Sequence, residues 1–237
     1  MPAYQISPLG DSALFIDFGN KIDEDINKEV LARTSQLKQN FTGILEAVPA
    51  YSSIIVYFNM LTWRKKTPAD MLVFDHLKEI TEQILSQPLQ NDPQEERIVN
   101  IPVCYAPEFA VDVNTIATAN NITAEEVIAL HHAKTYRVYM LGFLPGFCYL
   151  GETDDKIAMP RKTKPIPVAP GAVGIAGKQT GIYPLASPGG WQIIGRTPLK
   201  LFNVSAEQPA LLKAGDKVQF VPISINDFLE IQNSIFD

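Results

Sequence analysis

The chain has 237 residues, is 46% hydrophobic and carries a formal net charge of −6, and its length favours two domains over one. Neither this charge nor any basic helix indicates nucleic-acid binding, and no apolar run approaches the length of a membrane span. The first residues lack the basic and apolar segments of a secretion signal, so we expect a cytoplasmic protein. The two cysteines, Cys104 and Cys148, are far apart and offer neither a disulfide framework nor metal-ligand spacing.

The first 90 residues have the pattern of a small α+β domain. Period-two and helical hydrophobic spacing predicts the order ββαββα, with helices on one face of a sheet. The polar segment SQPLQNDPQEER contains two prolines and is typical of a linker, so we place domains at residues 1–90 and 91–237. The expected elements of the first domain are strands at 4–9, 12–19, 44–51 and 52–58 and helices at 23–39 and 68–85.

The second domain is predicted to be mainly β. Thr123 and Glu126 have the spacing of a capping box, with Ile122 and Val127 at the two positions of a hydrophobic staple. Many short strands separated by Gly/Pro turns indicate a β-barrel or sandwich. The expected elements are strands at 97–105, 136–141, 201–204 and 217–223 and helices at 113–120 and 123–132.

Residues 142–200 hold ten of the 14 glycines and show almost no ordinary helix or strand pattern. Dense alternation of glycine and proline specifies rigid, shaped loops, which commonly carry a site. Residues 134–200 also contain nine lysines and arginines against three acidic residues. Such a positive region favours a small anionic ligand or an acidic partner, although a solvated basic rim is the alternative.

Familiar catalytic motifs do not fit this region. Gly171, Gly174 and Gly177 have neither dinucleotide-fingerprint nor P-loop spacing. Cys148 lies in an apolar segment typical of a buried thiol. Ser187 lacks the surroundings of a nucleophile elbow.

The better candidates are polar residues held in the rigid loops. The guanidinium of Arg161 or Arg196 suits a carboxylate or a phosphate, and Gln179 lies in similar surroundings; a structural role as a loop clamp is the alternative for each. His131 ends the capped helix and is either a structural residue or an acid/base. The aromatic residues would form the walls of a cleft if they face one, and plain core if they do not: Phe143, Phe147, Tyr183 and Trp191.

The order of these motifs resembles a known family. His131 and Tyr136 precede GFLPGFCYL, which is followed by Pro160-Arg161, APGAVGIAG, QTGIYP and SPGGWQIIGRT. This order is similar to the B subunit of bacterial 5-oxoprolinase, a family also described as the first subunit of allophanate hydrolase and as inhibitors of a sporulation histidine kinase. GDSAL and AYSSIIVYF extend the resemblance over nearly the whole chain.

The resemblance implies an α+β N-terminal domain followed by a mainly-β, cyclophilin-like barrel. It also implies that the chain works with partner subunits C and A to open 5-oxoproline, a small anionic amide, to glutamate using ATP, whose contacts we expect to be shared with the partner subunit. Positions carried over as catalytic are His131, Arg161 and Gln179, and those carried over as substrate-binding are Tyr183, Arg196, Pro145, Gly146 and Trp191, with no metal.

Three alternatives remain open. The chain could be a regulatory module whose basic loops dock on an acidic helical bundle of a histidine kinase. It could instead belong to a related amide hydrolase of the allophanate type. Prolyl isomerase activity follows from fold analogy alone.

Overall fold

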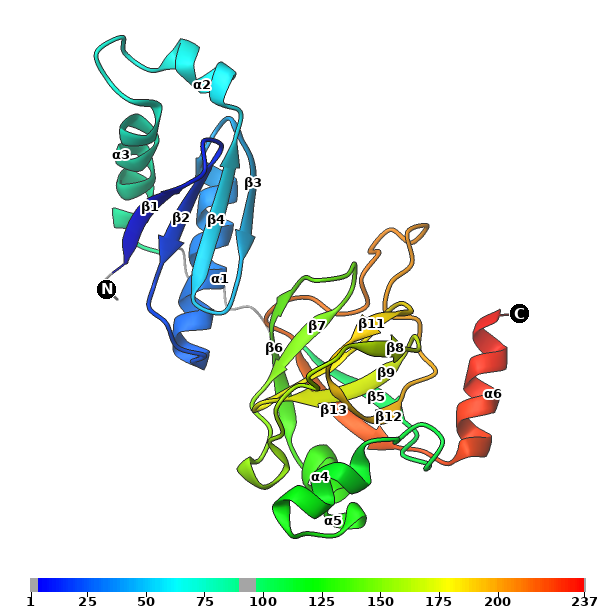
Figure 1. The fold of residues 1–237 in the computed structure, drawn as a ribbon. Helices are drawn as coiled ribbons and strands as arrows, with labels where there is room; N and C mark the ends of the chain where they lie inside the picture. Colours follow the sequence, from blue (N-terminus) through cyan, green and yellow to red (C-terminus); the bar gives the residue numbers. More distant parts are fainter. Residues whose placement is uncertain (1–3, 90–96, 237) are drawn as a thin grey trace. The chain divides into compact units, whose positions relative to one another are not determined.

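The computed structural model describes residues 4–89 and 97–236. The chain divides into two compact units, Met1–Gln94 and Glu95–Asp237 (Figure 1). The expected boundary between residues 90 and 91 lies outside the described residues. Within the described ranges, no helix combines the length and apolar character needed to cross a membrane.

The first unit is a four-stranded antiparallel sheet with helices packed on it (Figure 1). Alternate residues of its strands, such as Leu14, Ile16, Ile54 and Val56, are buried in one core with side chains from the helices, as the period of two in a half-buried strand requires. The strand order is β1 (Gln5–Leu9), β2 (Ala13–Asp17), β4 (Ser53–Phe58) and β3 (Ile44–Pro49), with the helices α1 (Glu24–Asn40), α2 (Met60–Lys66) and α3 (Val73–Ser86).

Local caps explain where these helices begin. The Asp23 carboxylate accepts hydrogen bonds from the N–H groups of Asp25 and Ile26, at 2.9 and 3.0 Å, so α1 starts where the sequence predicts. The helix expected at 68–85 is shorter, because α3 begins at Val73. The short helix α2, which is capped by the Asn59 side chain, was not predicted.

The second unit is built on a seven-stranded sheet that curls strongly. β13 and β5 run parallel, and the other neighbouring strands run antiparallel. Just beyond β5, Cys104 exchanges two hydrogen bonds with Arg196 of β12, at 2.8 and 3.0 Å, so the two outer strands meet. The strand order is β12 (Gln192–Arg196), β9 (Ala172–Ala176), β10 (Gln179–Ile182), β7 (Cys148–Gly151), β6 (Thr135–Leu141), β13 (Lys217–Pro222) and β5 (Ile98–Val103), and β8 (Ile166–Val168) pairs with β11 (Ser187–Gly189).

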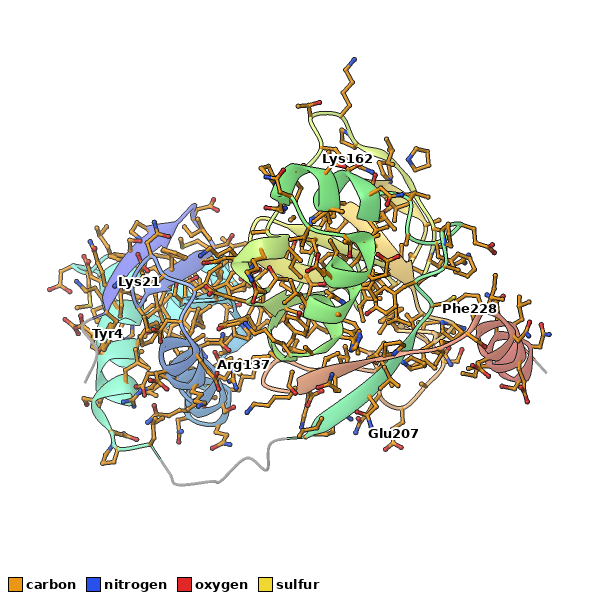
Figure 2. All side chains as sticks on the ribbon, turned by 90° about the horizontal axis from the view of Figure 1, so that it is seen from below. Tyr4, Lys21, Arg137, Lys162, Glu207 and Phe228 are labelled. Atoms are coloured by element: carbon orange, nitrogen blue, oxygen red, sulfur yellow. The ribbon has the colours of Figure 1, made fainter. Side chains whose placement is uncertain are left out.

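Helices cover parts of this unit. α4 (Val113–Asn120) and α5 (Ala124–His132) add Ile116 and Val127 to the core inside the curled sheet. The predicted capping box of α5 is confirmed. α6 (Ile225–Phe236) stands beside the sheet, and its Phe228 lies 4.6 Å from Phe109 between ring centroids (Figures 1 and 2).

Two expectations for this unit need correction. Residues 142–200 contain the regular strands β7 to β12, although their sequence does not show a strand pattern. The strand expected at 201–204 is absent from this described stretch, where Phe202 makes only an isolated bridge with Ala210. The structure is therefore a mixed α+β fold with a curled sheet.

Candidate functional site

Five aromatic rings gather on the outer face of the curled sheet and form the aromatic platform. The ring of Phe147 lies at its centre, with centroid distances of 4.9 Å to Tyr149, 5.1 Å to Tyr183 and 5.5 Å to Trp191. Phe143 adds a fifth ring, 5.5 Å from Phe147. Most rings meet edge to face, a favourable arrangement that also buries much apolar surface.

Glycines make room for these rings. A Cβ added at Gly181 would lie 3.0 Å from the Trp191 ring and 3.1 Å from the Phe147 ring. A Cβ at Gly174, the residue opposite Gly181, would lie 3.0 Å from the Trp191 Cβ. Gly174 and Gly181 look like turn residues in the sequence, but they are strand residues whose missing side chains leave room for the platform.

Replacing Gly181 tests this packing. In Gly181→Ala the new Cβ would also lie 2.9 Å from the carbonyl oxygen of Cys148. Because that oxygen belongs to the backbone of a paired strand, it cannot move away without weakening the sheet. We expect the free energy of unfolding to fall by about 2 kcal/mol, measured by urea denaturation. Gly190→Ala, whose new Cβ would have its nearest neighbouring atom 3.5 Å away, is the matched control and should change stability by less than about 0.5 kcal/mol. Equal effects of the two changes would contradict this account of the packing.

The loop between β6 and β7 forms the rim of the platform. Phe143 is 61% exposed and has a φ of 73°, an unfavourable backbone conformation for a bulky residue. Gly146 has a φ of 81°, and a Cβ there would meet Phe202 at 2.8 Å. Pro145 is exposed beside it. The loop therefore holds an aromatic side chain in solvent by means of a tight and partly strained turn.

Arg161 lies at the edge of the platform. Its guanidinium carbon is 5.8 Å from the centroid of the Trp191 ring, within the range of a cation–π contact, while Trp191 itself is only 4% exposed. Burial raises the pKa of the Tyr149 and Tyr183 phenols, and the nearby Arg161 charge opposes that rise. A cation and two neutral phenols thus face the same apolar surface.

Arg161 differs from two nearby lysines in its charge pairing. Lys162 pairs with Asp112 at 2.5 Å and Lys178 pairs with Asp155 at 2.7 Å. The exposed Arg161 guanidinium makes no hydrogen bond or ion pair within the described parts of the chain. Its N–H donors are therefore accessible from solvent, and a guanidinium of this kind can bind a carboxylate or a phosphate.

Gln179 lies on the same face of the sheet as the platform. It begins β10 two residues before Gly181, and alternate residues of a strand point to the same side, about 7 Å apart. Its register partners are Ala176 and Gly151. The structure therefore places Gln179 on the same face of the sheet as the buried Tyr183 and Trp191, with Arg161 at the edge of the Trp191 ring.

Arg196 lies at the end of β12 that is farther from Trp191. It ends β12, and its Nε donates to the carbonyl oxygen of Pro170 at 2.8 Å. Its guanidinium carbon is 5.6 Å from the Phe109 ring and 5.7 Å from the Phe228 ring. Five residues of strand separate it from Trp191, a distance of about 16 Å. These contacts fit the loop-clamp alternative, because Arg196 holds α6 and the β12 edge together.

His131 is sealed inside the second unit, with 0% exposure. Thr180 Oγ1 donates to the Gly174 carbonyl oxygen at 3.0 Å, so it accepts from His131 Nε2 at 2.9 Å. The other ring nitrogen, Nδ1, then accepts from the Tyr105 hydroxyl at 2.9 Å. Burial lowers the pKa of His131 to about 3, with a smaller contribution from His132. The imidazole is a neutral structural group, and the structure does not bring it to the platform.

Two residues that were not predicted also belong to this surface. Tyr149 adds a phenol to the platform, and Asp112 pairs with Lys162 at its edge. Asp112 directly precedes a helix, a position that normally indicates a helix cap, so no sequence signal marks its contact with a loop 50 residues away. The described residues contain no group of His, Cys, Asp and Glu side chains that could hold a metal ion.

Comparison with known proteins places the chain in a family. The family model for the carboxyltransferase domain, subdomain C and D, matches residues 4–212. The chain is 46% identical to the 5-oxoprolinase B subunit of Bacillus subtilis (strain 168), over 95% of each chain. It is 34% identical to the 5-oxoprolinase B subunit of Escherichia coli O157:H7, over 90% of this chain and 94% of that protein. The crystal structure of TTHA0988 matches with a TM-score of 0.75 and 34% identity, over 90% of this chain but 40% of that longer one.

Proposed function

Because the chain belongs to the family of carboxyltransferase subdomains C and D, which includes proteins named as the B subunit of 5-oxoprolinase, we propose that it is the B subunit of an ATP-dependent 5-oxoprolinase. In this proposal it works with subunits C and A to open 5-oxoproline to glutamate. The aromatic platform and Arg161 bind the substrate, and the partner subunits complete the site. The second unit, residues 95–237, is a cyclophilin-like barrel that carries this surface.

One observation supports the assignment of the site: the guanidinium of Arg161, which has no charge partner in the described residues, lies at the edge of the aromatic platform. 5-Oxoproline is a small ring with one carboxylate, so its ring can rest on the partly exposed Tyr149 ring, which packs on the buried Phe147, while Arg161 binds the carboxylate. Phe143, exposed at the rim, covers the ring from the solvent side. Each part of the substrate then meets a group of matching chemistry.

Ring opening needs an activated amide. Hydrolysis of an unstrained lactam is slow, and phosphorylation of its amide oxygen by ATP makes the ring carbon more electrophilic. Gln179, on the same face as the platform, orients the amide through its side chain. His131 takes no part in proton transfer, because both of its nitrogens are bonded within the interior. Its role is to hold Tyr105 and Thr180 in place.

The test is an assay of the reconstituted complex. The chain is purified with subunits C and A, and ATP-dependent release of glutamate from 5-oxoproline is measured. We expect turnover that requires this chain, and little ATP hydrolysis when 5-oxoproline is replaced by 2-pyrrolidinone, which has the same ring without the carboxylate. Equal use of both lactams would contradict the role of the carboxylate. Absence of turnover together with inhibition of a histidine kinase would favour the regulatory alternative.

A further inference from the structure

The loop that carries Arg161 is tied down on both sides of that residue. The N–H of Lys162 donates to the carbonyl oxygen of Gly190 at 2.7 Å. The side chain of Gln192 donates to the carbonyl oxygen of Pro160 at 2.9 Å. Both bonds join the loop to the residues around Trp191, so the backbone at Arg161 is fixed relative to the ring that its side chain covers.

A largely buried ion pair adds to these bonds. The Lys162 ammonium lies 2.5 Å from a carboxylate oxygen of Asp112, and the two side chains are 17% and 14% exposed. The same oxygen accepts from the N–H of Ile193 at 2.6 Å, and the Asp112 N–H donates to the Ile193 carbonyl oxygen at 2.9 Å. Asp112 therefore joins the start of α4, strand β12 and the Arg161 loop at one point. Lys162, its partner in the ion pair, is labelled in Figure 2.

Asp112 makes this contact in place of a helix cap. It occupies the N-cap position of α4, yet its side chain makes no capping hydrogen bond. An aspartate at that position ordinarily stabilises its helix by accepting hydrogen bonds from the first N–H groups. The carboxylate is turned toward Lys162 and Ile193 instead, which points to a requirement at the loop rather than in the helix.

We propose that Asp112 and Lys162 are positioning residues that hold Arg161 over Trp191, ready for an incoming carboxylate. This inference rests on the proposed function, because it assumes that Arg161 binds the anionic substrate. A long, exposed arginine on a mobile loop would lose side-chain and loop entropy on binding. The Asp112–Lys162 pair fixes the loop beforehand, so less of that entropy is lost when the substrate arrives.

The test combines a spectroscopic readout with kinetics. The full chain is labelled with 5-fluorotryptophan, which gives one ¹⁹F resonance for Trp63 and one for Trp191; Arg161→Ala identifies the Trp191 signal. In Lys162→Met we expect the Trp191 signal to move toward its Arg161→Ala position, while the Trp63 signal stays unchanged and reports an intact first unit. In the reconstituted complex, the same variant should raise KM for 5-oxoproline about tenfold with kcat nearly unchanged.

Two further variants make the result specific. Lys164→Met removes an exposed cation from the same loop and should leave the Trp191 signal and KM as in the wild type. Lys162→Arg retains a cation opposite Asp112 and should restore most of the wild-type KM.

An unmoved Trp191 signal in Lys162→Met would overturn the positioning role, whatever the kinetics. If the signal moves but KM is unchanged in both Lys162→Met and Arg161→Ala, Arg161 does not bind substrate. That result would refute the proposed site, and the positioning role with it. If KM rises in Arg161→Ala alone, the proposed site stands and the positioning role fails.

Discussion

Mild acid is expected to destabilise the protein through His131. The folded protein holds this imidazole neutral, with a pKa lowered to about 3, whereas the unfolded chain binds a proton near pH 6.5. Between these values the unfolded state binds more protons than the folded state, so the stabilisation is present above pH 6.5 and is lost as the pH falls. We expect the free energy of unfolding to fall by about 2.5 kcal/mol between pH 7.5 and pH 4.5, measured by urea denaturation.

The phenols that contact His131 do not titrate in this pH range, so we attribute the fall in the free energy of unfolding to His131 itself. The phenols of Tyr105 and Tyr136 have raised pKa values because they are buried, so both stay neutral throughout this range. In His131→Gln the side chain no longer titrates, and the dependence on pH should become much shallower although the variant is less stable at pH 7.5. His132→Gln, which changes the neighbouring and only partly buried histidine, should keep most of the slope. An unchanged slope in His131→Gln would show that other groups are responsible.

Local signals in the sequence were sufficient to predict several elements. The carboxylate of Asp23 and the capping box of Thr123 and Glu126 act within a single helical turn, so residue type and spacing predict where α1 and α5 begin. The strands of the first unit were predictable for a similar reason, because their alternating pattern reflects one buried face.

The strands of the second unit were not predictable from local pattern. AVGIA of β9 is buried on both faces, and its glycine and that of QTGI in β10 leave space for rings from distant parts of the chain. A strand that combines small residues with burial on both faces shows no alternation, and its glycines resemble turn signals. The same long-range packing created the aromatic platform.

The sequence predicted which types of residue could form the candidate site, but not which of them lie close together in the fold. Arg161 lies against the Trp191 ring, Tyr183 packs on Phe147, and Gln179 lies on the same face of the sheet, so these residues stay a prediction for the site. Arg196 has the same chemistry as Arg161 and lies between a glycine and a threonine in a loop-like sequence, but β12 carries it to the opposite end of a strand. His131 looked like an acid or base because its helix leads toward the loops, and only the fold shows that its ring turns inward.

Substitution of Arg161 is expected to have the largest effect on activity. Arg161→Ala removes the one guanidinium at the edge of the platform in the described part of the chain, at an exposed position that the fold does not depend on. Loss of an oriented, charged hydrogen-bond donor should lower kcat/KM for 5-oxoproline about a hundredfold in the reconstituted complex. Arg161→Lys keeps the charge but not the planar fork, so it should recover only part of the activity. Lys164→Ala removes an equal charge from the same loop and is the matched control.

The most direct measurement is therefore the affinity of the assembled complex for 5-oxoproline, determined by calorimetry for the wild type, Arg161→Ala and Lys164→Ala. Binding at least about tenfold weaker in Arg161→Ala alone, with unchanged thermal unfolding, is the result expected if Arg161 and the aromatic platform bind the substrate carboxylate and ring. Equal affinity in all three proteins would contradict that conclusion.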